Sequence, residues 1–145
     1  MTERTLTGRP VVAGSASGTA IVSKEPLSFW GGLCPNTGEI IDRRHKRSGA
    51  NVSERIFVFP RGKGSSTSSA TLMESIKNGV APAAIINLKV DPILALGSIV
   101  SDELYNRAMP IVVLDEQDFY LIKEGDYLTI ESDGKVLVSS KPSAK

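Results

Sequence analysis

Residues 55–79, "RIFVFPRGKGSSTSSATLMESIKNG", join an apolar run to an amphipathic one through a loop rich in glycine and serine. The apolar run shows no alternation with polar residues, which is typical of a strand covered on both faces. Leu72, Met73 and Ile76 then recur at helical spacing, and Asn78-Gly79 is a plausible end for the helix. The stretch therefore predicts a strand–loop–helix unit.

Similar units continue toward the C-terminus. Residues 81–88 ("APAAIINL") and 109–115 ("MPIVVLD") are short buried strands by the same criteria. Between them, residues 91–108 read as a helix with Asp91 as N-cap and Pro92 at the first helical position. We expect its core face to be one apolar stripe, made of Ile93, Leu96, Ile99, Val100 and Leu104. The order β-α-β-α-β predicts parallel strands joined by right-handed crossovers.

Both ends of the chain carry β-type patterns around this parallel unit. The predicted elements are a hairpin or tight barrel-like corner at residues 9–23, a short strand at 38–42, and antiparallel strands at 119–132 and 135–140 joined by a turn at Asp133-Gly134. We expect residues 141–145 to fray. The predicted fold class is α/β, with a short parallel unit between β-rich ends in a single domain over residues 1–145.

Composition limits the classes of function. The 145 residues are 41% apolar and 23% charged with a net charge of +1, which argues against a nucleic-acid partner. No apolar run reaches the ~18 residues of a membrane span, and the first residues lack the apolar centre of a signal peptide. A lone cysteine, Cys34, can form neither an internal disulfide nor a thiolate-ligated metal site by itself. We expect a cytoplasmic protein without a membrane partner.

The glycine-serine loop is the leading candidate for a functional site. It follows a predicted parallel strand, where ligands gather near helix N-termini. Gly62 and Gly64 allow positive φ and a close approach of backbone amides to an anion. The loop lacks the spacing of a Walker A motif, a hydrolase nucleophile elbow and a dinucleotide fingerprint. Residue chemistry alone leaves three interpretations open: a helix capped by Ser65, Ser66 or Thr67, an anion site, or serine catalysis.

Several motifs, in order, resemble the small swivelling subunit of aconitase X proteins. These are "EPLSFWGG" (25–32), "IIDRRH" (40–45), "RGKGSSTSSATLMESI" (61–76) and "DPILALGSIVSDELY" (91–105). The resemblance runs from about Gly8 to Leu114. The loop and "EGDYLTI" (124–130) also resemble the mobile fourth domain of ordinary aconitases. The resemblance implies a swivelling β/β/α domain.

The resemblance also implies roles for individual residues. In ordinary aconitases a Gly-Ser-Ser-Arg segment carries the catalytic serine, so Ser65 corresponds to the proton acceptor. Thr67 stands where that family has its arginine, so another group, from the partner or from Lys63 or Arg61, must bind the substrate anion. The residues expected to bind substrate are Gly64, Ser66, Thr67, Lys63, Arg61 and Arg43. The iron–sulfur cluster of the family is expected on a large partner subunit, with no metal bound by this chain.

The implied activity is that of a hydro-lyase active only with its large subunit. Separate small subunits of this family are associated with dehydration of (R)-5-phosphomevalonate to trans-anhydromevalonate 5-phosphate in an archaeal-type mevalonate (isoprenoid) pathway. The closest alternative is the small subunit of a cis-3-hydroxy-L-proline dehydratase. An alternative of another class is a non-catalytic anion-binding or regulatory module. A self-sufficient enzyme is the weakest interpretation, because one cysteine cannot ligate a cluster.

Four further features have simple structural interpretations beside functional ones. Phe29 and Trp30 can pack locally or contact the large subunit. The basic run 42–47 is a solvated turn or part of the interface, and a triad using His45 has little support from spacing. Cys34 is expected to be structural, and Asp91 a helix cap.

Overall fold

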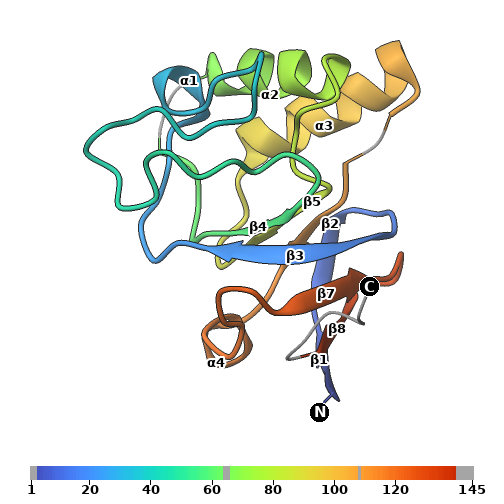
Figure 1. Ribbon diagram of the computed structural model, residues 1–145. Helices are drawn as coiled ribbons and strands as arrows, with labels where there is room; N and C mark the ends of the chain where they lie inside the picture. The colour runs from blue at the N-terminus through green and yellow to red at the C-terminus, as the bar shows by residue number, and fades with distance from the viewer. Residues whose placement is uncertain (1–2, 64–65, 108, 140–145) are drawn as a thin grey trace.

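The computed structural model describes residues 3–63, 66–107 and 109–139 (Figure 1). The strands and helices follow one another as β1 (Glu3–Thr7), β2 (Arg9–Val12), β3 (Ala16–Val22), α1 (Phe29–Gly32), β4 (Ile56–Val58), α2 (Ser68–Lys77), β5 (Ala84–Asn87), α3 (Pro92–Tyr105), β6 (Ile111–Val113), α4 (Glu116–Phe119), β7 (Tyr127–Ile130) and β8 (Lys135–Ser139). The expected frayed tail, residues 141–145, and the loop residues Gly64 and Ser65 lie outside the described residues.

The strands form one mixed sheet in the order β1-β8-β7-β3-β4-β5-β6-β2. The neighbours β3, β4, β5 and β6 pair in parallel. The flanking pairs β1–β8, β7–β8, β3–β7 and β2–β6 are antiparallel. The predicted parallel unit between β-rich ends is thereby confirmed, as is the β7–β8 hairpin. Helices α1, α2 and α3 lie together on one side of the sheet, away from β1, β7 and β8 (Figure 1).

The two edge strands of the sheet are consecutive in the chain and are joined at Gly8. The Gly8 amide donates to the Gly134 carbonyl at 3.0 Å. A Cβ on Gly8 would lie 2.3 Å from Val112 Cγ1, so only glycine fits between β6 and the β7–β8 turn. This close approach lets the chain turn from one edge of the sheet to the other.

Of the two forms predicted for residues 9–23, a hairpin or a corner, the structure has the corner, because strands β2 and β3 do not pair. Two other local predictions were wrong. Residues 38–42 make only isolated bridges, from Glu39 and Ile40. The segment 119–122, expected in a strand, contains the end of α4 and the turn after it. Here Asp115 caps α4 by accepting from the Asp118 amide at 3.0 Å, which starts a helical turn before β7.

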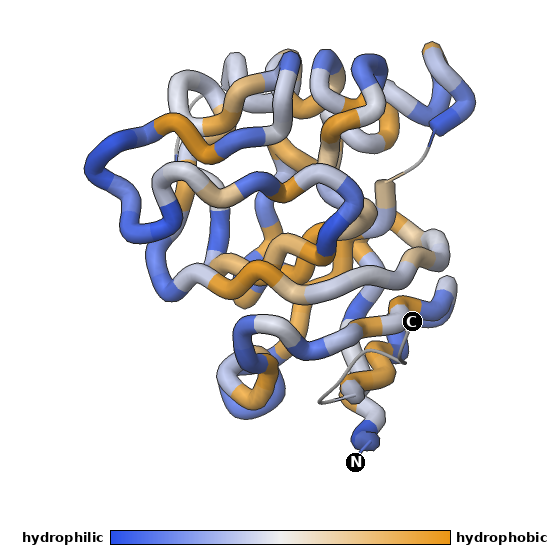
Figure 2. The backbone as a smooth tube through the Cα atoms, viewed as in Figure 1, coloured by the Kyte–Doolittle hydropathy of each residue, from blue (hydrophilic) through white to orange (hydrophobic). Residues whose placement is uncertain are grey.

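Apolar residues fill both sides of the parallel strands, along which the hydrophobic residues gather in Figure 2. On the helical side, Phe29, Phe57 and Phe59 stack, with 4.3 Å between the Phe57 and Phe59 ring centroids. On the other side, Ile56 and Val58 join a second cluster with the antiparallel strands. Strand β4 therefore lies between two cores, which explains why its sequence shows no alternation.

Helix α3 begins as predicted, with Asp91 as N-cap and Pro92 at its start, but its core face differs from the prediction. The buried residues are Leu94, Ala95, Gly97, Ser98 and Ser101. The expected apolar stripe points outward instead, with Leu96 55%, Ile99 50% and Leu104 63% exposed. The reason is close packing on α2: a Cβ on Gly97 would lie 2.9 Å from the Ser69 carbonyl oxygen, so small residues face inward.

Candidate functional site

The segments that follow three parallel strands converge at one end of the sheet. Gly62, after β4, forms a parallel bridge with Leu27, which follows β3. The amides of Leu88 and Lys89, after β5, both donate to the Pro60 carbonyl, at 2.9 and 3.2 Å. The glycine-serine loop therefore leaves β4 between two neighbouring segments, at the carboxyl edge where ligands of parallel sheets bind.

The first half of the loop is held by bonds on both sides. The Leu27 amide donates to the Arg61 carbonyl at 3.3 Å, and the Lys63 amide donates to the Leu27 carbonyl at 3.1 Å. The Gly62 amide donates to Asp91 Oδ2 at 2.9 Å. Gly62 does not use the positive φ that glycine permits; its lack of a side chain instead allows the close approach of Asp91.

The second half of the loop runs into α2. The Ser66 carbonyl accepts from the amide and the hydroxyl of Ser69, and the Ser68 hydroxyl accepts from the Trp30 amide at 3.1 Å. Thr67 occupies the N-cap position and makes no side-chain capping bond there, so the expected cap is not formed by its hydroxyl. The described parts of the loop are thus anchored on either side of Gly64 and Ser65, which themselves lie outside the described residues.

Two hollows flank Lys63. A groove of about 210 Å³ is lined by Leu27, Phe29, Arg61, Gly62, Lys63, Ser68, Val90, Asp91, Pro92, Ile93 and Leu94. A second hollow, of about 330 Å³, is lined by Glu25, Pro26, Asp42, Arg44, His45 and Lys63. The first groove contains the N-terminal end of α2, whose dipole favours an anion. The start of α3 also lines the groove, but its first amides are already bonded to Asp91. With Arg61 and Lys63 at its rim, the groove can receive a small anionic molecule.

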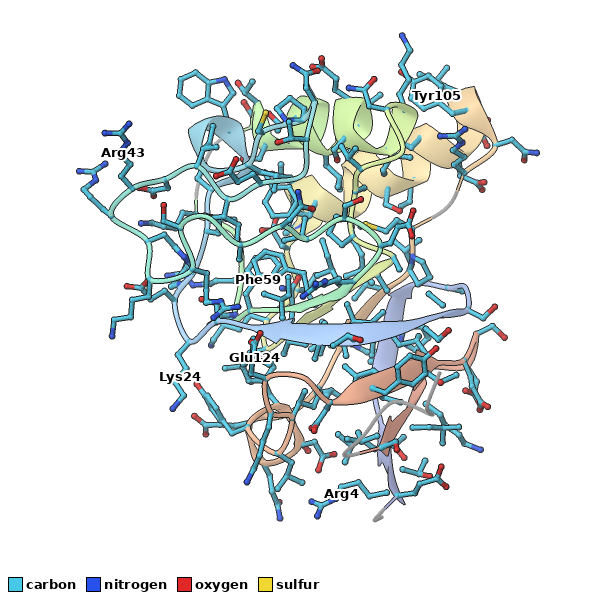
Figure 3. All side chains as sticks on the ribbon, in the orientation of Figure 1. Arg4, Lys24, Arg43, Phe59, Tyr105 and Glu124 are labelled. Atoms are coloured by element: carbon cyan, nitrogen blue, oxygen red, sulfur yellow. The ribbon has the colours of Figure 1, made fainter. Side chains whose placement is uncertain are left out.

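The structure brings together most of the described residues that the sequence singled out. Arg61 and Lys63 are exposed and line the groove, while Ser66 and Thr67 are exposed at the start of α2. Arg43 is exposed on the outlying loop after residue 41 (Figure 3) and does not line either hollow described above, whereas its neighbour Arg44 lines the second. The binding roles of these residues stay predictions.

His45 has a structural arrangement and not that of a triad. The ring is buried, and its Nδ1 accepts from the Arg47 amide at 3.0 Å. In the neutral ring the proton is therefore on Nε2, which lies 3.4 Å from Ser23 Oγ. Ser23 Oγ donates in turn to the Glu25 carbonyl. A protonated Nε2 cannot take the Ser23 proton, so His45 fixes the basic loop to the segment after β3.

Phe29 and Trp30 differ in their exposure to solvent. Phe29 is 1% exposed and belongs to the aromatic stack of the core, so its expected contact with a partner is excluded by burial. Trp30 is 58% exposed beside the start of α2. Trp30 alone of this pair is available as an interface anchor.

The described residues do not fit an iron–sulfur cluster. They contain no group of three or more histidine, cysteine, aspartate or glutamate side chains placed to hold a metal ion. A hydrogen bond with the Thr37 side chain, followed by one with the Asn36 backbone, lowers the pKa of the Cys34 thiol. In the same described ranges, no helix has the length and apolar character needed to cross a membrane.

Sequence reasoning missed the link between Asp91 and Gly62. The two residues are 29 positions apart, and Asp91 has the appearance of an ordinary helix cap. The only signal was indirect: both residues follow predicted parallel strands, and the carboxyl ends of such strands meet at one edge.

Several known proteins are similar to this chain in sequence and in fold. A family model described as the aconitase X swivel domain matches residues 5–139. A Pseudomonas aeruginosa protein named cis-3-hydroxy-L-proline dehydratase is 49% identical over 109 residues, which are 75% of this chain and 19% of that protein. A Methanocella arvoryzae protein named phosphomevalonate dehydratase small subunit is 40% identical over 131 residues, 90% of this chain and 95% of that protein. The crystal structure of Thermococcus kodakaraensis aconitase X in its holo form superposes with a TM-score of 0.83 at 37% identity, covering 93% of this chain and 98% of that one.

Proposed function

Because the chain belongs to the aconitase X swivel domain family, we propose that it is the small subunit of a dehydratase that acts together with a large subunit. The anchored loop carries this proposal, since its position beside a cationic groove suits a base acting on an anionic hydroxyacid. The chain spans about a fifth of the Pseudomonas relative and nearly all of the archaeal small subunit. The name of the archaeal relative, a small subunit, supports a large partner subunit that carries the remaining machinery.

In the proposed reaction, Ser65 removes a proton from the carbon next to the substrate carboxylate. The electron pair of that C–H bond forms a C=C bond, and the C–O bond at the neighbouring carbon breaks. The departing hydroxide takes up a proton, equivalent to the one that Ser65 removed, and leaves as water. The family implies an iron–sulfur cluster that assists hydroxyl departure, and we place this cluster on the large subunit. The present chain contributes the base and part of the anion site.

A free serine hydroxyl is far too weak an acid to be ionised at neutral pH, so its surroundings must stabilise an alkoxide. The amides at the start of α2, the positive end of the α2 dipole, and the charges of Arg61 and Lys63 all favour negative oxygen at this place. Removal of water when the large subunit covers the loop strengthens these interactions. The same cations replace the arginine of ordinary aconitases in binding the substrate anion.

The leading substrate is (R)-5-phosphomevalonate. Two observations support it: a match over nine-tenths of this chain to a small subunit named for this activity, and a groove whose cations and α2 N-terminus suit a phosphate. The second candidate is cis-3-hydroxy-L-proline, favoured by the 49% identity to the Pseudomonas protein. Both reactions need the same base and differ in the group held beside it.

The surface expected to meet the large subunit lies on the helical side. Trp30 is exposed next to the loop, and Leu96 and Ile99 expose an apolar strip on α3. A partner that covered Trp30 would also enclose the loop, because the Trp30 amide is bonded to Ser68 at the start of α2.

The test is to co-purify the chain with its large subunit, reconstitute the cluster anaerobically, and assay both substrates. Water loss from phosphomevalonate, and not from hydroxyproline, supports the leading assignment; the reverse supports the second. A partner without cluster-ligating cysteines, together with inactivity on both substrates, would instead support a non-catalytic module. Dehydration by the isolated chain would contradict the two-subunit proposal.

A further inference from the structure

A third cavity, of about 490 Å³, lies where the segments 22–25, 46–47 and 120–124 meet. Lys24 and Glu124, which are labelled in Figure 3, belong to two of these segments. The cavity is larger than either hollow beside Lys63 and shares no lining residue with the groove at the glycine-serine loop. Its volume is within the range of about 300–1,000 Å³ that is usual for small-molecule sites. It is here named the Lys123 cavity.

Hydrogen bonds between the three segments hold the walls of the Lys123 cavity in place. Glu124 accepts from the Val22 amide through Oε1 at 2.8 Å and from Arg47 Nη2 through Oε2 at 2.9 Å. Glu25 Oε1 accepts from the Lys46 amide at 2.9 Å. Both carboxylates of the cavity are therefore bonded to protein groups, and the walls are formed before a ligand enters, which lowers the cost of binding.

The charges around the Lys123 cavity favour an anion. In the described part of the chain, the ammonium groups of Lys24, Lys46 and Lys123 have no carboxylate within 4.0 Å. The Arg47 Nε is buried without a hydrogen-bond partner among the described residues, so this guanidinium has a donor that Glu124 does not use. Four cations and two carboxylates line the cavity, which leaves an excess of two positive charges: Lys24, Lys46, Arg47, Lys123, Glu25 and Glu124.

Most of the remaining lining of the Lys123 cavity is apolar. Val22, Tyr120 and Ile122 contribute to it, and Ile122 is buried. Tyr120 is half-exposed, but its ring packs edge-on against buried Phe119, with 5.1 Å between the ring centroids and 88° between the planes. This contact fixes the tyrosine ring as a wall of the cavity. An aromatic or aliphatic group can pack against it while an anionic group on the same molecule faces the cations.

We propose that the Lys123 cavity binds a small phosphate monoester with an uncharged apolar body. A phosphate monoester carries about −1.5 to −2 charges at neutral pH, which matches the excess of two positive charges, and its oxygens accept from arginine and lysine donors. A monocarboxylate supplies about half of this charge. The substrate proposed above has a carboxylate in its body, which the apolar wall does not suit. The cavity is therefore a second ligand site, and this inference does not rest on the proposed function.

The test is titration of the full chain with phenyl phosphate, followed by calorimetry and by the amide chemical shifts of the ¹⁵N-labelled protein. We expect saturable binding with a Kd below about 1 mM, and shifts at the amides of Lys46, Arg47 and Lys123. Inorganic phosphate should bind about tenfold more weakly, because it leaves the apolar wall uncovered. Benzoate should also bind about tenfold more weakly, because it carries one charge.

Two substitutions separate the parts of the proposed site. Lys123→Ala should weaken phenyl phosphate and inorganic phosphate alike, by about tenfold, since it removes a charge-assisted bond to the phosphate group. Tyr120→Ala should weaken phenyl phosphate and leave inorganic phosphate unchanged. Lys135→Ala is the matched control, because it removes an exposed cation on β8 that does not line the cavity. Lys63→Ala removes a cation of the groove and should likewise leave the Kd of phenyl phosphate unchanged.

Binding that is lost in Lys63→Ala and kept in Lys123→Ala would assign the phosphate to the groove and overturn the inference, while the proposed function would stand. Absence of saturable binding would overturn it as well. Equal affinity for benzoate, or equal effects of Tyr120→Ala on both phosphates, would refute the proposed class of ligand. The titration is repeated with the assembled two-subunit complex, where we expect the same Kd; abolition of binding there would mean that the large subunit covers the cavity and would overturn the second ligand site.

Discussion

The polar inward face of α3 leads to a sharp stability prediction. Ser98 is 0% exposed, and its hydroxyl donates to the Met109 carbonyl at 2.6 Å while accepting from the Met109 amide at 3.1 Å. Met109 is 3% exposed and directly precedes the segment that enters β6. Ser98→Ala removes the hydroxyl that is bonded to both the carbonyl and the amide of Met109.

The magnitude follows from the two groups left unpaired. An unsatisfied buried backbone group costs about 1–3 kcal/mol, which gives about 2–6 kcal/mol for two groups. Because the chain before β6 can relax in part, we expect the free energy of unfolding to fall by about 3 kcal/mol. With a urea m-value of about 1–3 kcal/mol/M, the midpoint should move down by about 1–3 M.

Ser101→Ala is the matched control on the same helix. Ser101 is also 0% exposed, and its hydroxyl makes no hydrogen bond to any residue that the structure describes. Replacing a buried, unpaired hydroxyl by a methyl group should leave stability within about 0.5 kcal/mol or increase it. Urea unfolding followed by circular dichroism measures both variants. Equal shifts, or a loss below about 1 kcal/mol for Ser98→Ala, would refute the reasoning.

Two further predictions concern the surface. Trp30→Ala should weaken binding of the large subunit by about 2 kcal/mol, or roughly 30-fold in Kd, without lowering the unfolding midpoint, because the indole is exposed in the free chain. Titration calorimetry measures the Kd, with Leu137→Ala on β8 as the control. Equal effects of the two substitutions would count against Trp30 as an interface anchor. Alkylation of Cys34 should reach half its maximal rate at a lower pH than alkylation of a free cysteine, since the Thr37 side chain lowers the pKa of the thiol and more thiolate is present at a given pH. Thr37→Val should move that midpoint back up, and an unmoved midpoint would exclude Thr37 as the cause.

Local patterns predicted the parallel unit well and the faces of α3 poorly. Strands β4, β5 and β6 were recognisable because strands covered on both faces are short, continuous apolar runs. The helix pattern of α3 was correct, but the outward placement of Leu96 and Ile99 depends on α2, which approaches so closely that Gly97 and serines must face it. Periodicity identifies an apolar stripe and does not say whether the core or a partner covers it.

The closure of the sheet and the geometry of the loop were beyond local patterns for a related reason. In the sequence Gly8 is indistinguishable from an ordinary turn glycine, because its neighbours Val112 and Gly134 are distant along the chain. The bond from Gly62 to Asp91 likewise joins segments that sequence reasoning treated separately. The resemblance to a family predicts that the loop carries the base, whereas the contacts that hold the loop came only from the three-dimensional arrangement.

The most direct test of the account is the rate of dehydration by Ser65→Ala in the complete enzyme. A positioned general base contributes about 10²- to 10⁴-fold, so we expect kcat to fall by that factor while subunit assembly and the absorbance of the partner's cluster stay unchanged. Turnover equal to that of the unmodified enzyme, in a fully assembled and cluster-loaded complex, would contradict the claim that this chain supplies the base.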